Sequence, residues 1–154
     1  MKEIKVCFAA SSGGHFEQIA MLKPLMDKYP CCVVTEKTQY STGIQGKRMY
    51  YLHQINRREK TCFLWLFINA IYSLVIFAKE KPDVIITTGV LAMIPLCLIC
   101  KVFKRKLIYI ESFAKVTSPT ETGKMMYKFA DRFYVQWESM LKFYPNAICV
   151  GGIY

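Results

Sequence analysis

The sequence has few of the side chains on which common enzyme chemistries depend. It contains only two histidines, His15 and His53, and no D-x-D pair, so no metal-binding pattern is recognisable. There is no G-x-S-x-G motif, which argues against a hydrolase with a nucleophile elbow. A G-x-G-x-x-G fingerprint is also missing, and we identify no acidic residue at the end of the second expected strand, where it would bind ribose. A dinucleotide site is therefore poorly supported, and no cofactor is expected.

Charged residues are scarce, and most of them are basic. Only 21% of the residues are charged while 53% are hydrophobic, so some apolar surface should face a membrane or another protein. The net charge of +10 favours anionic partners such as phosphorylated substrates, acidic lipids or nucleic acid. No helix-turn-helix, zinc-binding or stacked-aromatic pattern is present, which disfavours nucleic acid.

The seven cysteines do not predict a disulfide framework. Their number is odd, and the first six residues alternate charged and apolar side chains instead of forming a cleavable signal sequence. We therefore expect free thiols in a reducing cytosolic compartment. Cys97 and Cys100 form a C-x-x-C, but no second Cys/His pair lies near them, so a metal or redox role is not predicted.

Short apolar runs alternate with helical segments along the whole chain. Strands are expected at residues 4–10, 31–35, 49–52, 83–88, 106–110, 132–136 and 147–150. Helices are expected at residues 15–28, 62–78, 90–103 and 123–130, with a helical turn at 139–143 and a loop over 36–48. This alternation predicts an α/β fold in which a doubly wound parallel sheet carries helices on both faces, in one domain over residues 1–154.

A glycine-rich loop follows the first expected strand. Ligands of open parallel sheets bind beyond the carboxyl ends of the strands, which is where this loop, SSGGH, lies. Gly13 and Gly14 would let the backbone approach a ligand, and amides at the start of the helix after Ser12 would suit a phosphate. His15 could donate to a phosphate oxygen or orient an acceptor hydroxyl. A plain turn with a capping serine is the alternative.

Two further loops leave strand ends with unusual residues. Thr88 and Gly89 could help to cradle a diphosphate, or Thr88 could simply cap the next helix. Glu111 and Ser112 follow a buried apolar strand. Glu111 could hydrogen-bond a sugar, serve as a base, or form a structural ion pair with Lys115 or Lys124.

The uncharged run at residues 62–78 predicts a helix about 26 Å long. Its clearly polar members, Asn69 and Ser73, share one face, and it has no charged outer stripe, so its outer face should meet lipid or protein. We expect Trp65 and Phe67 to contact a membrane surface, helped by nearby bases that would meet acidic headgroups: Arg57, Arg58, Lys60, Lys79 and Lys81. A buried core helix and a membrane span are the alternatives.

Three segments together resemble one family over nearly the whole chain: SSGGHFEQ at residues 11–18, TTG at 87–89 and the long block YIESFAKVTSPTETGKMMYKFADRFYVQWESM at 109–140. The pattern is similar to the acceptor-recruiting subunit of the split transferase that adds the second N-acetylglucosamine to dolichol-diphosphate in eukaryotes. It is also similar to bacterial capsule and exopolysaccharide enhancer subunits. The block is specific, whereas the Gly-Gly-His sequence alone is not.

The resemblance implies a Rossmann-like domain equivalent to the amino-terminal half of a B-type glycosyltransferase. A separate catalytic subunit would bind the nucleotide sugar, which is expected to be UDP-linked. This chain would bind a lipid-diphosphate-linked saccharide at the cytoplasmic face of the membrane, as a peripheral or monotopic subunit that is inactive alone. A self-sufficient small glycosyltransferase is the rival, and it would need a donor site of its own.

The resemblance also implies a set of site residues. His15 and Glu111 would be catalytic, and no metal is implied. The acceptor diphosphate would bind at a set of small and hydroxyl residues: Ser12, Gly13, Gly14, Thr88, Gly89 and Ser112. The eukaryotic members carry an amino-terminal membrane anchor that we do not recognise here, so residues 62–78 are the expected substitute. The last residues, from Gly151 onward, stand where a two-domain enzyme would begin its linker.

Overall fold

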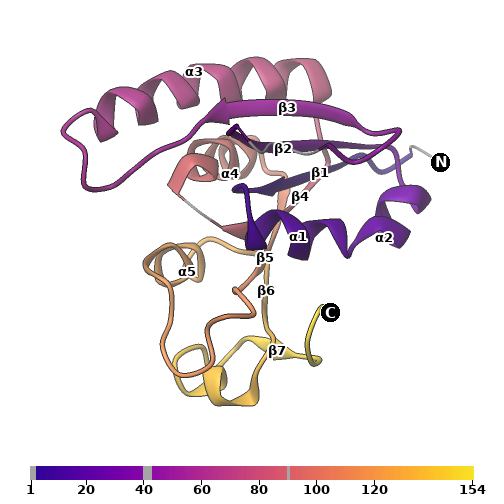
Figure 1. Cartoon of the computed structure of the whole chain (residues 1–154). Coiled ribbons are helices and arrows are strands. Elements are labelled where there is room, and N and C mark those ends of the chain that lie inside the picture. Colours follow the sequence, from indigo (N-terminus) through magenta and orange to yellow (C-terminus); the bar gives the residue numbers. More distant parts are fainter. Residues whose placement is uncertain (1–2, 40–42, 90) are drawn as a thin grey trace.

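A parallel β-sheet organises the chain, of which the computed structural model describes residues 3–39, 43–89 and 91–154 (Figure 1). The strands lie in the order β3-β2-β1-β4-β5-β6-β7, and each neighbouring pair is parallel. Their bounds are β1 Val6–Ala10, β2 Cys31–Lys37, β3 Arg48–His53, β4 Val84–Gly89, β5 Lys106–Ile110, β6 Arg132–Val135 and β7 Ile148–Cys149. The order of the strands reverses beside β1, as in doubly wound sheets. The expected α/β class is confirmed.

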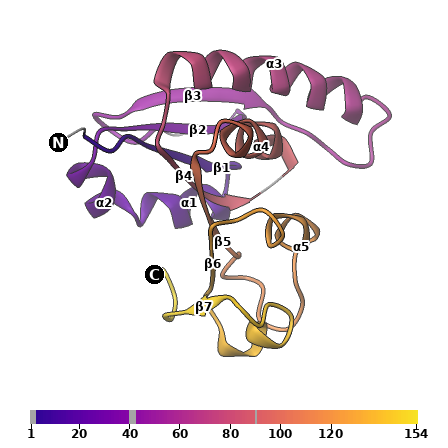
Figure 2. The same cartoon turned by 180° about the vertical axis from the view of Figure 1, so that it is seen from behind.

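Helices cover both faces of the sheet (Figures 1 and 2). Their bounds are α1 Gly14–Ala20, α2 Lys23–Lys28, α3 Cys62–Glu80, α4 Ile94–Val102 and α5 Glu121–Met126, with 3-10 segments η1 Leu91–Met93 and η2 Glu138–Lys142. The central strand β1 is buried throughout and alternates between two cores. Cys7 and Ala9 pack with α3, α4 and α5, whereas Phe8 packs with α1 and α2.

Several predicted boundaries need correction. The single helix expected at 15–28 is divided after Ala20, and Pro24, which lacks a backbone N–H, stands in the first turn of α2. The helix expected at 90–103 begins with η1 before α4, and Val90 lies outside the described residues. α5 begins earlier than expected because the Thr120 side chain accepts a hydrogen bond from the amide of Gly123 at 2.8 Å and caps the helix.

The second strand ends later than predicted, which changes the reading of Glu36. β2 continues to Lys37, so an acidic residue does stand near its carboxyl end, contrary to expectation. The Glu36 side chain is buried and accepts hydrogen bonds from the backbone amides of Ile55 and Ser12. Burial raises the pKa of Glu36, and the two amides partly offset this shift. The carboxylate therefore holds main chain on either side of the strand end.

α3 runs beside the edge strand β3 (Figure 1). Its uncharged polar residues, Asn69 and Ser73, are turned inward. Asn69 and Ser73 are fully buried, and the Asn69 amide bonds both the N–H and the C=O of His53 at 2.9 and 2.8 Å. These bonds satisfy main-chain groups at the end of the edge strand. The side of α3 away from the sheet is apolar and exposed; this outer face consists of Phe63, Leu64, Phe67, Ile71, Leu74 and Val75.

The exposure of α3 excludes the buried-core alternative. Within the described residues it is the one helix long and apolar enough to cross a membrane, with 19 residues, yet only 22% of its apolar window is buried. Trp65 differs from the outer face, because it is half-buried, packs against the core and lies with its ring 4.6 Å from that of His53. Phe67 is 65% exposed.

A buried carboxylate at the carboxyl end of α3 ties this helix to the sheet. Glu80 is buried and bonds the side chains of Lys5, Arg48 and Tyr50, which come from before β1 and from β3. Burial alone would raise the pKa of Glu80, but these hydrogen bonds and charges outweigh it and lower the pKa to about 2. The cluster joins the last turn of α3 to two strands.

Candidate functional site

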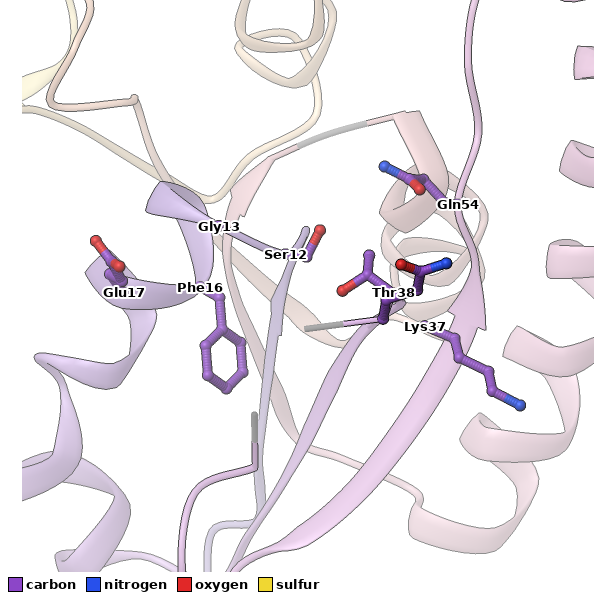
Figure 3. A pocket seen from close by; sticks show the side chains of 8 residues that line it. Ser12, Gly13, Phe16, Glu17, Lys37, Thr38 and Gln54 are labelled. Atoms are coloured by element: carbon purple, nitrogen blue, oxygen red, sulfur yellow. The ribbon is translucent and has the colours of Figure 1, made fainter. Parts of the chain in front are cut away.

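Two cavities lie at the carboxyl edge of the sheet, on the segments that the sequence singles out. The first is a broad hollow of about 1020 Å³ beside the β1–α1 loop. Figure 3 shows Ser12 and Gly13 on one side of it and Thr38 and Gln54, which follow β2 and β3, on the other. Within the described part of the chain, no neighbouring atom lies within 4 Å of the position that a Cβ would take on either Gly13 or Gly14. The glycine pair therefore borders open space.

The second cavity, which we call the His15 cavity, has a volume of about 420 Å³ and a more polar lining. It joins the start of α1 to the loop before α3 and to the segment between β5 and α5. Three of its side chains are basic or can become so: His15, Arg57 and Lys115. The rest of the lining comprises Ile55, Leu91, Tyr109, Pro119, Thr120, Glu121 and Thr122.

His15 has an unused ring nitrogen in this environment. Its Nδ1 atom is buried and has no hydrogen-bond partner. Burial lowers the pKa of His15, while a hydrogen bond with Thr88 and the charge of Glu111 partly offset the shift. The Thr88 hydroxyl donates to the backbone carbonyl of His15 at 3.2 Å. Thr88 thus fixes the loop that carries the histidine.

The second predicted loop lies beside the first but is closed to solvent. Thr88 and Gly89 are both buried. A Cβ on Gly89 would lie 2.5 Å from the hydroxyl of Tyr109, and the residue has a positive φ of 97°, so only glycine fits. Within the described residues, Thr88 bonds the backbone of His15, and Gly89 packs the end of β4 against Tyr109 of β5.

The third loop is built around the buried carboxylate of Glu111, which is 1% exposed. It accepts hydrogen bonds from the Tyr144 hydroxyl at 2.7 Å, the Thr120 hydroxyl at 2.9 Å and the amide of Ser112 at 3.0 Å. The alternative of a structural ion pair with Lys115 or Lys124 is not found among the described residues: neither lysine forms an ion pair with Glu111, and Lys124 pairs with Glu121. Burial and then the bond to Glu111 raise the pKa of Tyr144, which keeps its proton for this bond. Ser112 is also buried.

Gly123 fits tightly against this carboxylate. A Cβ at this position would lie 2.1 Å from Glu111 Oε2, 2.6 Å from the Tyr144 hydroxyl and 2.7 Å from Thr120 Oγ1. The T-G-K sequence at 122–124 therefore owes its glycine to the approach of α5 to Glu111. Glu111 fixes Thr120, and Thr120 both caps α5 and lines the His15 cavity.

Two buried glutamines connect the segments that carry the family resemblance to one another. The Gln18 side chain, from α1, accepts from the backbone amide of Phe113 at 3.1 Å and from the Gln136 amide at 2.9 Å. Gln136 also donates to the carbonyl of Glu111 at 2.9 Å, and the Trp137 ring donates to the carbonyl of Phe113 at 2.7 Å. The SSGGHFEQ and YVQW segments therefore hold the ESF segment between them.

The predicted loops lie at the carboxyl edge of the sheet, but several residues that line the His15 cavity were not predicted as site residues. The His15 cavity is lined by Lys115, Thr120 and Thr122. All three lie inside the long block at 109–140, so the block could have pointed to them. Arg57 was expected to face a membrane, yet it lines the cavity, and its guanidinium donates to Thr122 Oγ1 at 2.8 Å. Arg58 is exposed and does not line this cavity. The local sequence contains no signal that separates the two arginines.

Several solved structures have the same fold. The chain matches Acinetobacter baumannii MurG with a TM-score of 0.71 at 15% identity, covering 88% of this chain and 42% of that one. It matches a UDP-N-acetylglucosamine 2-epimerase from Rickettsia bellii with a TM-score of 0.75 at 13% identity, covering 99% and 46%. At these identities the likeness establishes the fold alone, which is Rossmann-like and corresponds to less than half of each longer chain.

Sequence relatives are more informative. A protein from Rattus norvegicus named UDP-N-acetylglucosamine transferase subunit ALG14 is 28% identical over 116 residues, which cover 68% of this chain and 54% of the relative. The protein of the same name from Schizosaccharomyces pombe is 37% identical over 75 residues, covering 46% and 36%. The chain thus spans about half the length of the rat relative. The family model described as "Oligosaccharide biosynthesis protein Alg14 like" matches residues 6–153, and the chain belongs to that family.

Proposed function

We propose that this chain is the acceptor- and membrane-binding subunit of a split glycosyltransferase. A partner subunit would bind a UDP-linked donor sugar, and this chain would bind a lipid-diphosphate-linked saccharide at the cytoplasmic face of the membrane, in the synthesis of an oligosaccharide or polysaccharide. The names of the relatives, which are transferase subunits, support both the reaction class and the partner. The observation that carries the acceptor role is the His15 cavity, with its basic and hydroxyl lining at the ligand-binding edge of the sheet.

The outer face of α3 is the proposed membrane contact. It is apolar and exposed, and the polar residues of the helix are buried against the sheet. Basic residues stand at both ends of the helix and suit acidic headgroups: Arg58, Lys60, Lys79 and Lys81. A helix lying in the interface is supported over a membrane span, because β3 before α3 and β4 after it belong to the same sheet.

The proposed roles of His15 and Glu111 differ. His15 has an unsatisfied ring nitrogen at its cavity and would hold the acceptor diphosphate or its attacking sugar. Glu111 is buried and bonded to Thr120 and Tyr144, which supports the positioning role of the two that the sequence left open. It would act by holding Thr120, and with it α5, against the cavity. The glycine loop at 12–14 and the strand end at 88–89 would shape the backbone around the acceptor.

Reconstituted sugar transfer tests the proposal. The chain is assayed with and without its partner subunit, using a UDP-sugar and a lipid-diphosphate-linked acceptor. We expect turnover only when both subunits are present, and efficient transfer by the isolated chain would instead establish the self-sufficient enzyme. His15→Ala should raise the acceptor KM and leave the donor KM unchanged. Acceptor kinetics equal to those of the wild type would remove His15 from the site.

The role of Glu111 is separated by magnitude. A general base typically contributes about a hundredfold or more to turnover. As a positioning residue, Glu111→Gln should lower turnover by about tenfold or less, with an unchanged pH profile. Tyr144→Phe removes one of the same hydrogen bonds without touching the carboxylate and should have a similar, smaller effect. A loss far beyond a hundredfold in Glu111→Gln alone, together with loss of the acidic limb of the pH profile, would identify the base.

A further inference from the structure

We infer that Arg57 and Lys115 bind the diphosphate of the acceptor in the His15 cavity, and that Arg57 is therefore a substrate-binding residue. This inference rests on the proposed function and assigns the anionic part of the substrate to particular side chains. It moves the diphosphate from the hollow beside the glycine pair to the neighbouring cavity. It also separates Arg57 from the membrane-facing bases with which it is contiguous in sequence.

The charge balance of the two cavities supports this choice. The larger hollow has one basic residue, Lys37, and one acidic residue, Glu17, in its lining. The His15 cavity has Arg57 and Lys115 besides the histidine, and its acidic member, Glu121, is bonded to Lys124 at 2.7 Å. An anion therefore gains more from the smaller cavity.

Arg57 and Lys115 form no ion pair among residues 3–39, 43–89 and 91–154, although Arg57 and Glu121 attract each other across the cavity. The ion pairs of the described chain use other side chains, whereas Lys115 is half-buried and has no side-chain bond. A half-buried cation without a partner has a desolvation cost that a bound anion would recover. The buried Nδ1 of His15, also without a partner, is a separate sign of a missing ligand.

Arg57 is held in a suitable arrangement for this task. One end of its guanidinium donates to Thr122 Oγ1 at 2.8 Å, which leaves its remaining N–H groups for a ligand. Arg57 thereby joins the loop before α3 to the start of α5. A planar guanidinium has five N–H donors, of which Thr122 takes one, so enough remain to bond two phosphate oxygens at once. The same loop continues within five residues to Cys62, where α3 begins, so a lipid leaving the diphosphate has the outer face of α3 beside it.

Binding of inorganic pyrophosphate to the purified chain tests the inference directly. Titration calorimetry at pH 7 should detect one site, and pyrophosphate should shift the ring resonances of His15 in NMR spectra. Arg57→Gln and Lys115→Met should each weaken binding by about tenfold or more, the usual effect of losing one hydrogen bond to a charged group. Arg58→Gln is the matched control: Arg58 is exposed, as Arg57 is, and carries the same charge one residue away, but it does not line the cavity. Its substitution should change the affinity less than twofold.

Two results would overturn the inference. One is wild-type affinity in both cavity variants; the other is an equal loss in Arg58→Gln, which would indicate general attraction to a basic surface. Circular dichroism checks that the variants fold. If Arg57→Gln does not fold, Arg57→Lys, which keeps the charge, replaces it in the titration.

The transfer assay separates this inference from the proposed function. With the partner present, Arg57→Gln should raise the acceptor KM at an unchanged donor KM. Robust partner-dependent transfer with unaltered acceptor kinetics in the cavity variants would refute the diphosphate assignment and leave the proposed function intact. No transfer despite site-specific pyrophosphate binding would refute the proposed function and leave an anion site of another purpose.

Discussion

Replacing Gly123 by alanine should lower the stability of this protein, although alanine is the better helix former. The change removes a glycine from α5, which in an exposed helix would stabilise the fold by about 1 kcal/mol. Here the new Cβ would lie 2.1 Å from Glu111 Oε2, 2.6 Å from the Tyr144 hydroxyl and 2.7 Å from Thr120 Oγ1. These atoms cannot all retreat, because they are hydrogen-bonded to one another inside the fold.

The magnitude follows from two costs and one gain. Overpacking a tight site costs about 1–3 kcal/mol, and loosening a hydrogen bond to a charged group costs about 1.5–3 kcal/mol. After subtracting the helix-forming gain of about 1 kcal/mol, we expect Gly123→Ala to lower the free energy of unfolding by about 1.5–5 kcal/mol. Urea titration followed by circular dichroism measures the change.

Gly14→Ala is the matched control for this prediction. Gly14 also lies in the first turn of a helix, but no atom of the described residues lies within 4 Å of its Cβ position, so the substitution should be neutral or slightly stabilising. A double variant of Gly123→Ala with Tyr144→Phe removes one colliding oxygen, and its cost should fall short of the sum of the two single costs. Equal urea midpoints for Gly123→Ala and Gly14→Ala would refute the reasoning.

Three further changes have defined outcomes. Asn69→Ala leaves main-chain groups of β3 without partners and should cost about 2 kcal/mol or more in urea titration, whereas Ser73→Ala, whose buried hydroxyl has no partner, should cost little. The pKa of Glu80 is about 2 in the folded chain, below its unfolded value, so its stabilising effect is present above about pH 4.3 and is lost as the pH falls toward 2. Glu80→Gln should therefore have a flatter stability profile over that window, and an identical slope would contradict this. Phe67→Lys should keep the fold and lower the affinity for acidic vesicles more than tenfold in a sedimentation assay, since burial of one phenylalanine is worth about 1.5–3 kcal/mol. Trp65→Lys should instead unfold the protein, because Trp65 packs against the core. Unchanged sedimentation of Phe67→Lys would show that the outer face of α3 is not the membrane contact.

The order of strands and helices was predictable because each strand is an apolar run with clear punctuation. Local pattern also placed the candidate loops at the correct edge, since every strand is parallel and ends there. The break inside the first helical segment was missed because its apolar spacing continues through Met21 and Leu22, while Pro24 sets the new start. The α3 helix was recognised from its missing charges. Its polar side faces the sheet and its apolar side faces outward, because Asn69 bonds the main chain of β3.

The side chains of the site were less predictable, because their exposure depends on distant partners. Glu111 stands at a strand end, where sequence reasoning expects an accessible carboxylate, but Tyr144, 33 residues later, and α5 close over it. Arg57 belongs by sequence to a basic cluster before an apolar helix, yet it is held by Thr122, which lies 65 residues further on. Spacing along the chain contains no record of either contact.

The central position of β1 has a consequence for how the protein is made. Val6 pairs with Val84, so one edge of β1 stays open until nearly 80 more residues have been synthesised. At ribosomal rates of about 5–20 residues per second, that interval lasts roughly 4 to 16 seconds. The apolar helix at 62–80 is completed during this interval, before the strand that closes the sheet. Residues 62–80 are therefore available to a chaperone or a bilayer as an apolar helix before the sheet can close.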